Sequence, residues 1–156
     1  MGNLKELLTN IWTARVLVIV GLFFGYVPIG QTFSHIGDPN FMLVDTAFLT
    51  SHGYYHFFRE AFGDLAGITV ILAIMFAAPK FRNPALWWVM LITMFGIFAP
   101  FWIGMPFMDE LSAPNMNAEI AHLRMAVPAV IGCFLAKRYY FEAKAQPGVE
   151  AQPGVL

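Results

Sequence analysis

The sequence predicts an all-α integral membrane protein, a four-helix bundle with both termini on the cytoplasmic side. Its 156 residues are 58% hydrophobic and only 12% charged, and the mean hydropathy is +0.63. Soluble domains carry about 25% charged residues, so this chain lacks the polar surface that water requires. Four apolar stretches approach the roughly 20 residues that cross a bilayer. The basic residues between these stretches indicate the orientation.

The four predicted spans differ in how completely apolar they are. In chain order they cover residues of about 11–33, 54–78, 84–107 and 117–135. The first and third are apolar almost throughout. The second and fourth become long enough only by taking polar residues into the membrane, because their uninterrupted apolar stretches begin after Asp64 and Arg124.

The spans form one predicted domain, residues 1–144. The first external loop, 34–53, is long, and its apolar part is too short to cross the membrane. We expect that part to lie on the membrane surface or over the bundle. Residues 145–156 carry the pentamer AQPGV twice. Two proline–glycine pentamers cannot build a packed core, so a disordered tail is predicted.

Loops with and loops without lysine and arginine alternate along the chain. The loops 34–53 and 108–116 contain neither residue. The basic residues at the other ends are Lys5, Arg15, Lys80, Arg82, Lys137, Arg138 and Lys144. Because basic residues mark the cytoplasmic side, we predict a multi-pass protein of the cell's inner (plasma) membrane with cytoplasmic termini.

Small residues predict how the helices pack. The first span contains Gly21 and Gly25, and the second contains Gly63 and Gly67. Glycines four residues apart let helix backbones approach closely in lipid. We expect these motifs to pack the first two spans against each other, with a homodimer face as the alternative.

Polar residues open the second span in a regular pattern. His52, His56, Glu60 and Asp64 recur every four residues, and Arg59 lies among them. On an α-helix such residues form one stripe that drifts by about 40° per step. This stripe lies at the external end of the span, so the sequence places any function in the outer half of the bundle.

The fourth span enters the membrane from the same side with Glu119, His122 and Arg124. Ionisable groups in a membrane are costly and face partners, cavities or pathways. Arg59 and Arg124 can neutralise two of the carboxylates of Glu60, Asp64 and Glu119. The remaining carboxyl, buried without a cation, is expected to be protonated and able to act as a general acid.

Three interpretations of this polar cluster remain open. It is a structural network without chemistry, a pocket for a lipophilic or quinone-like molecule, or a metal site. In the pocket interpretation the catalytic residues are Glu60, Asp64, Arg59 and Arg124. The predicted substrate contacts are Tyr55, His56, Trp102, Glu119 and His122.

The metal interpretation depends on three histidines. His52 and His56 have the i, i+4 spacing that places two imidazoles on one ion, and His122 enters from the same side. Copper, zinc or iron are the candidate ions. Glu119 and His122 also form the Glu-x-x-His pair of di-iron bundles, of which those sites need two.

Two sequence patterns carry a resemblance to a known family. They are Arg15-x5-Gly21-x3-Gly25 in the first span and Arg59-Glu60-x2-Gly63-Asp64-x2-Gly67 in the second. In these patterns and in its layout the chain resembles the DoxX-like four-helix small membrane proteins. The resemblance implies a four-helix membrane fold. Some members of that family are subunits of quinone-linked oxidoreductases, so it also implies a role beside such an enzyme. The histidine pair and the long first loop depart from that pattern.

These observations lead to two hypotheses. The first is a membrane protein whose external polar pocket binds a lipophilic or quinone-like molecule, acting as an acid–base isomerase, cyclase or hydrolase. The alternative is a non-catalytic or metal-binding subunit of a larger membrane redox complex. The expected cofactor is a metal ion or a quinone, and the expected partners are lipid, a small molecule and further copies or subunits. A net charge of -1 gives no basis for nucleic-acid binding.

Overall fold

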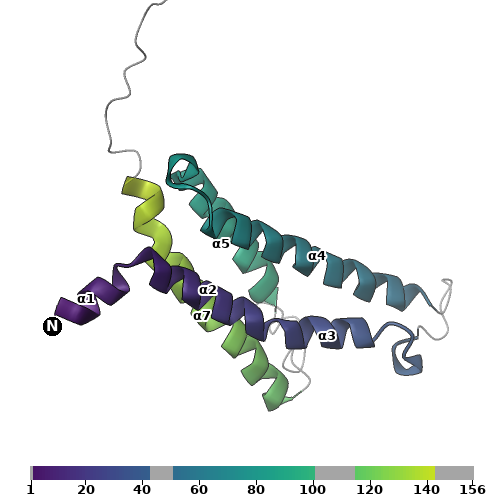
Figure 1. Cartoon of the computed structure of the whole chain (residues 1–156). Helices are drawn as coiled ribbons and strands as arrows, with labels where there is room; N and C mark the ends of the chain where they lie inside the picture. The colour runs from purple at the N-terminus through teal and green to yellow at the C-terminus, as the bar shows by residue number, and fades with distance from the viewer. Residues whose placement is uncertain (1, 43–50, 101–114, 143–156) are drawn as a thin grey trace, which may run out of the picture.

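The computed structural model describes residues 2–42, 51–100 and 115–142, and all regular structure in these ranges is helical (Figure 1). The elements are α1 (Gly2–Leu8), α2 (Ile11–Phe24), α3 (Tyr26–Ser34), η1 (Pro39–Phe41), α4 (His52–Met75), η2 (Pro79–Phe81), α5 (Pro84–Phe98) and α7 (Met116–Phe141). The described part of the chain is therefore all-α, as predicted.

The helices lie where the apolar stretches predict them. They begin at Ile11, His52, Pro84 and Met116, against predicted starts of about 11, 54, 84 and 117. Two helical stretches, Ile11–Ser34 and Met116–Phe141, are long and apolar enough to cross a membrane. The predicted outer end of the third span, with Trp102, and the tail 145–156 lie outside the described residues.

Asparagine side chains cap the N-termini of three of the long helices. Asn10, Asn83 and Asn115 precede α2, α5 and α7, and each side-chain oxygen accepts a hydrogen bond from a backbone N–H of the first turn. Such caps satisfy donors that have no partner within the helix. Pro84 follows Asn83 at the first position of α5, where its missing N–H costs nothing.

The first predicted span is divided into α2 and α3. Gly25 joins the two helices in a helical conformation, and its N–H donates to the carbonyl of Gly21. Pro28 lies in the first turn of α3 and has no N–H to donate to the preceding turn. Pro28 therefore accounts for the division. The two helices together still form one continuous apolar stretch, Ile11–Ser34.

The closest helix contact is between α2 and α7, which corrects the predicted pairing of the first two spans. A Cβ added to Gly21 would lie 2.5 Å from the carbonyl oxygen of Met125, and one added to Gly132 would lie 2.6 Å from that of Ala14. Side chains at these glycines would thus collide with the backbone of the neighbouring helix. The glycines of the first predicted span therefore lie against α7.

Gly63 and Gly67 of α4 differ in how closely another helix approaches them. A Cβ on Gly67 would come within 2.7 Å of Ile97 in α5, whereas a Cβ on Gly63 meets open space. Gly67 therefore brings α4 close to α5, and Gly63 has no such neighbour among the described residues.

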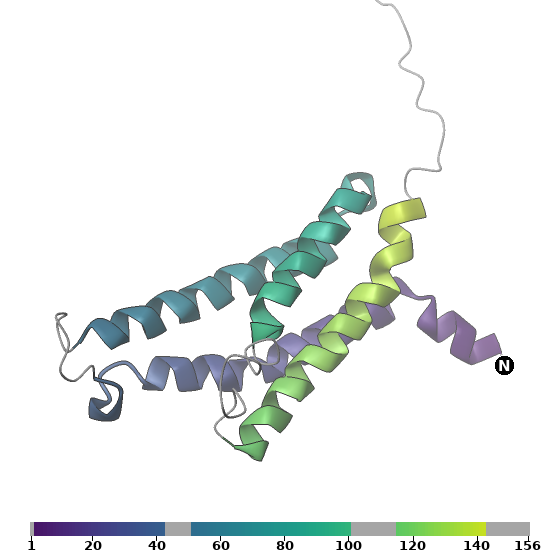
Figure 2. The ribbon, with the colours of Figure 1, turned by 180° about the vertical axis from the view of Figure 1, so that it is seen from behind.

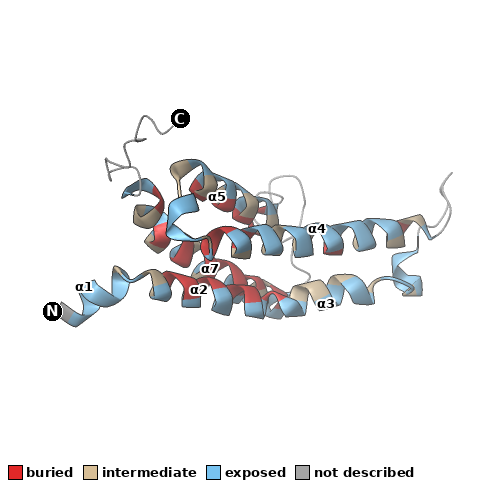
Figure 3. Ribbon diagram, turned by 45° about the horizontal axis from the view of Figure 1, so that its top comes forward, coloured by how far each residue is buried: buried red, intermediate tan, exposed pale blue. Residues whose placement is uncertain are grey.

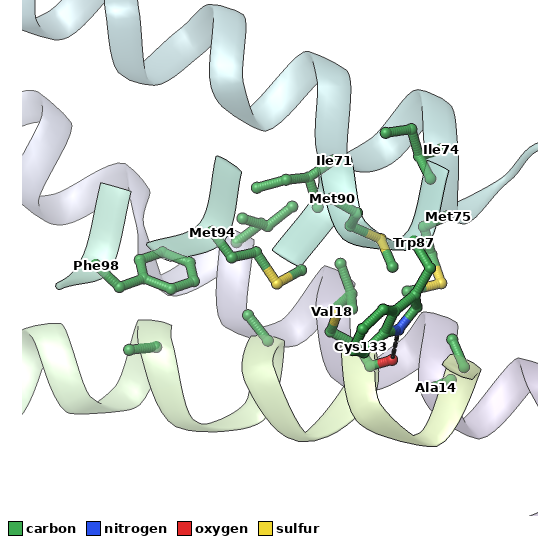
Figure 4. Packing of buried hydrophobic residues seen from close by; sticks show 14 of the residues in the cluster. Ala14, Val18, Ile71, Ile74, Met75, Trp87, Met90, Met94, Phe98 and Cys133 are labelled. Atoms are coloured by element: carbon green, nitrogen blue, oxygen red, sulfur yellow. Dashed lines mark hydrogen bonds between the residues drawn. The ribbon is translucent and has the colours of Figure 1, made fainter. Parts of the chain in front are cut away.

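The hydrophobic core is concentrated at one end of the bundle, which we call the core end. The core end is formed by the start of α2, the end of α4, the start of α5 and the end of α7. From there the buried side chains continue along α2, α5 and α7 as far as Leu22, Phe98 and Met125 (Figure 4). Trp87 is 1% exposed there, and its indole N–H donates to the carbonyl of Cys133 over 3.0 Å. At the opposite end, the cavity end, α3 and α4 lean away from α5 and α7 (Figures 1 and 2).

The outer surface of the bundle is apolar. Large hydrophobic side chains point outward from every long helix, and much of the ribbon is exposed (Figure 3). Phe23 and Ile92 are each 66% exposed. Water-soluble monomers rarely expose contiguous apolar patches larger than a few hundred Å².

Candidate functional site

A cavity of about 750 Å³ lies at the cavity end, between α3, α4, α5 and α7. Its wall combines polar and apolar side chains from all four helices. The acidic residues of this wall on α4 are Glu60 and Asp64, and α7 contributes His122. Three of the residues that the sequence predicts for the site therefore meet around one space.

The angular positions of residues around α4 explain why Glu60 and Asp64 face the cavity. Together with Phe57 and Ile68 they line it at steps of three, four and four residues, which is the spacing of one helix face. The His52–Asp64 stripe drifts by about 40° per step, or about 120° over its length. Its two ends therefore lie on different faces of α4.

The imidazole of His122 is held by its own helix. Its Nδ1 lies 2.6 Å from the carbonyl oxygen of Ala118, and the residue is 5% exposed. Because a carbonyl can only accept, Nδ1 carries the hydrogen. In the neutral ring Nε2 is then the acceptor, so His122 brings a potential base to the cavity.

Apolar residues form the rest of the cavity wall. Ile68 comes from α4, Ile97 from α5 and Met125 from α7. Gly96 also lines the cavity, and a Cβ there would meet no atom of another described residue within 4 Å. The cavity is therefore amphipathic, with ionisable groups on α4 and α7 and hydrocarbon beside them.

The turn after α3 forms the outer edge of the cavity. His35 stacks on Phe41 with ring centroids 3.9 Å apart and meets the edge of Phe57 at 4.9 Å. The hydroxyl of Tyr54 donates to the carbonyl of Asp38 over 3.0 Å, which ties the turn to α4. His35, Asp38 and Phe57 all line the cavity.

Five polar cavity residues on the α3 side are absent from the predicted site: Gln31, Thr32, Ser34, His35 and Asp38. A signal for the first two exists in the sequence, because Gln31 and Thr32 are polar residues inside an otherwise apolar span. No sequence pattern connects His35 and Asp38 to the second span, since the fold of the loop brings them there.

His52 and His56 form a separate cluster with Tyr55 and Arg59, away from the cavity wall. The two Nε2 atoms of the histidines are 3.1 Å apart. The Arg59 guanidinium lies 3.5 Å from Nδ1 of His56 and over the ring of Tyr55. Arg59 therefore contacts an imidazole and a phenol, and within the described ranges no ion pair joins it to Glu60 or Asp64.

The predicted three-histidine metal site is not assembled. His122 lines the cavity from α7, while His52 and His56 lie on another face of α4. Within residues 2–42, 51–100 and 115–142, no group of three His, Cys, Asp or Glu side chains is placed to hold a metal ion. The 120° drift of the α4 stripe is the physical reason, because it separates the histidines from the carboxylates.

The remaining predicted residues lie near the start of α7 or beyond the described residues. Arg124 is exposed, and Glu119 is partly buried in the first turn of the helix. Neither is among the described residues of the cavity wall. Trp102 lies outside the described ranges.

No model of a known protein family matches the chain, and comparison with curated proteins and with solved structures finds no match.

Proposed function

We propose that this chain is a multi-pass membrane protein that binds a lipophilic molecule with a polar head, such as a quinone, in the cavity between α3, α4, α5 and α7. One observation carries the proposal: Glu60, Asp64 and His122 share a cavity of about 750 Å³ with apolar residues. Small-molecule sites typically have volumes of roughly 300–1,000 Å³ and place a few polar groups in an apolar wall.

The apolar exterior supports the membrane location. On α5, Trp88, Ile92 and Phe95 are each at least half exposed. In water these side chains would favour aggregation, whereas lipid solvates them. The two helical stretches long enough to span, together with the apolar α5, account for three of four proposed crossings.

The fourth crossing is α4, which has the length to span but carries three charged residues in its outer half. Two of them, Glu60 and Asp64, face the cavity, while Phe58, Phe62 and Leu65 are exposed on other faces. Directing carboxyls inward and aromatic rings outward is how a helix carries ionisable groups through lipid. In the proposed topology both termini are cytoplasmic and the cavity lies in the outer half of the membrane.

The polar groups suit a head group with oxygen atoms that exchange protons. A protonated carboxyl of Glu60 or Asp64 can donate to a carbonyl oxygen, and Nε2 of His122 can accept from a hydroxyl. These groups lie on opposite helices and can act on one bound head. Proton transfer between such groups is the basis of acid–base isomerases, cyclases and hydrolases.

Ligand retention by the purified chain tests this proposal. Native mass spectrometry of the detergent-solubilised full chain should show a retained small molecule, or binding of an added short-chain quinone. Asp64→Asn and Glu60→Gln should weaken binding. Glu6→Gln is the matched control, because Glu6 is exposed on α1. A parent chain that retains nothing and binds no quinone would refute the proposed pocket.

The histidine pair favours a second function, transition-metal binding by a subunit of a larger membrane complex. Two ligand nitrogens bound at 2.0–2.1 Å to one zinc ion are roughly 3.3 Å apart in tetrahedral geometry, close to the 3.1 Å between the Nε2 atoms of His52 and His56. Metal analysis of the purified chain with His56→Ala as the variant tests it. A metal content that His56→Ala leaves unchanged would count against this site.

A further inference from the structure

The carbonyl groups at the end of α4 and just after it accept hydrogen bonds from arginine and tyrosine side chains of other segments. Arg15 of α2 donates its Nε–H to the carbonyl of Met75 over 3.3 Å. Arg82, which follows η2, donates its Nε–H to the carbonyl of Ala77 over 3.0 Å. The hydroxyl of Tyr140 donates to the carbonyl of Ile74. Two guanidinium groups therefore converge on carbonyls two residues apart.

The charge at this point is not balanced by the described chain. The C-terminus of a helix carries the equivalent of about half a negative charge, whereas Arg15 and Arg82 bring two full positive charges. Within residues 2–42, 51–100 and 115–142, no carboxylate forms an ion pair with either guanidinium. The described residues therefore leave an excess of positive charge at the end of α4.

Arg15 is built into the fold. It is only 9% exposed, and its guanidinium lies over the rings of Trp12 and Phe76 at 4.7 and 4.8 Å. The two rings pack against the guanidinium, and the Met75 carbonyl accepts from its Nε–H. A guanidinium has five N–H donors, so the Nη groups remain to receive an anion.

We propose that Arg15 and Arg82 form a binding site for a phosphate-type oxyanion at the core end, which in the membrane is the headgroup phosphate of an anionic phospholipid. Guanidinium groups match phosphate oxygens with paired hydrogen bonds. The site rests on the membrane location proposed above but not on the cavity.

The surface beside the site suits a lipid. Trp12, Val16 and Ile19 form an apolar strip along α2, each at least 46% exposed. Acyl chains can lie along this strip while the phosphate reaches the arginines. Trp12 is also in the first turn of α2, and tryptophan near the end of a membrane helix marks the boundary between lipid and water.

Lipid binding to the full chain in detergent tests the site. The probes are dioleoylphosphatidylglycerol, dioleoylphosphatidylcholine as the lipid without net charge, and inorganic phosphate. Native mass spectrometry measures binding. The parent chain should prefer phosphatidylglycerol, and Arg82→Gln should weaken that binding about fivefold, the effect of one arginine near a membrane surface. Arg15→Lys, which keeps the charge but loses the paired donors, should also weaken it.

Lys5→Gln is the matched control, because Lys5 is an exposed cation on α1 at the same end. Equal binding of the two lipids by the parent chain, or an equal loss in Lys5→Gln and Arg82→Gln, would overturn the proposal. Competition by inorganic phosphate would show that both anions use one site; stabilisation by phosphate without lipid preference would overturn the lipid assignment. Asp64→Asn should keep the lipid preference. Failure of the cavity proposal can therefore be distinguished from failure of the lipid site.

Discussion

Nδ1 of His122 lies 2.6 Å from the carbonyl oxygen of Ala118, one turn earlier in α7. This hydrogen bond fixes which ring nitrogen carries the proton and leaves Nε2 as the acceptor of the neutral ring. The carboxyls of Glu60 and Asp64 line the same cavity from α4. A bound head group can thus meet an acceptor on one helix and carboxyl groups on the other.

His122→Gln should weaken the binding of a short-chain quinone by about tenfold, the effect of losing one hydrogen bond of roughly 1–1.5 kcal/mol. Glutamine keeps polarity and a similar length but has no imidazole. Titration monitored by native mass spectrometry or quenching of tryptophan fluorescence measures the change. Arg124→Gln is the control, since Arg124 is exposed two residues further along α7. Equal effects of both variants would contradict a contact made by the imidazole.

Gly21→Ala should destabilise the bundle by about 1–3 kcal/mol, the usual cost of overpacking. The added Cβ would lie 2.5 Å from the carbonyl oxygen of Met125, so α2 and α7 must move apart. Gly63→Ala is the matched control on α4, where a Cβ meets open space. Unfolding by sodium dodecyl sulfate in mixed micelles measures both. Equal stability of the two variants would argue against the α2–α7 contact.

Trp87→Phe should lower the free energy of unfolding by about 1–3 kcal/mol, because it removes the indole hydrogen bond to the Cys133 carbonyl and leaves a void in the core. Trp88→Phe provides the control next door, since Trp88 is 50% exposed. Its replacement removes only a surface contact and should change stability little. The same micelle unfolding assay compares the pair. A larger effect at Trp88 would mean that the packing of α5 is rotated from that described.

The proposed topology predicts opposite labelling of two introduced cysteines. Cys133 is fully buried, and Cys133→Ala removes the only natural thiol. In that background Ser34→Cys should react with an impermeant maleimide added outside intact cells. Lys80→Cys should react only after the membrane is opened. Both positions are exposed in the structure. Labelling of both from outside would exclude the proposed four crossings.

The positions of the helices were predictable because hydropathy is a local property of the sequence. The meeting of Glu60, Asp64 and His122 was also predictable, since polar residues in apolar helices must share a space. The partner of Gly21 was not predictable, because a small-residue motif permits close approach without specifying which helix approaches.

The limits of the predicted site have an equally physical cause. Tyr55, His56 and Arg59 are close in sequence to Glu60, but the rotation of α4 places them on another face. Four-residue spacing gives a straight stripe only over short distances. Conversely, Gln31 and His35 reach the cavity through the path of α3 and its following turn, which no spacing rule describes.

The cover over the end of α4 has a consequence for the order in which the chain assembles during synthesis. Tyr140, which donates to the Ile74 carbonyl, is made 66 residues after it. Arg15 is already present when α4 leaves the ribosome, whereas the last donor arrives only with the end of α7. A nascent chain stopped at residue 136 should therefore hold the end of α4 less firmly than the full chain, measured as faster proteolysis near residue 80. The hydrogen bonds at the end of α4 are thus complete only once α7 has been synthesised.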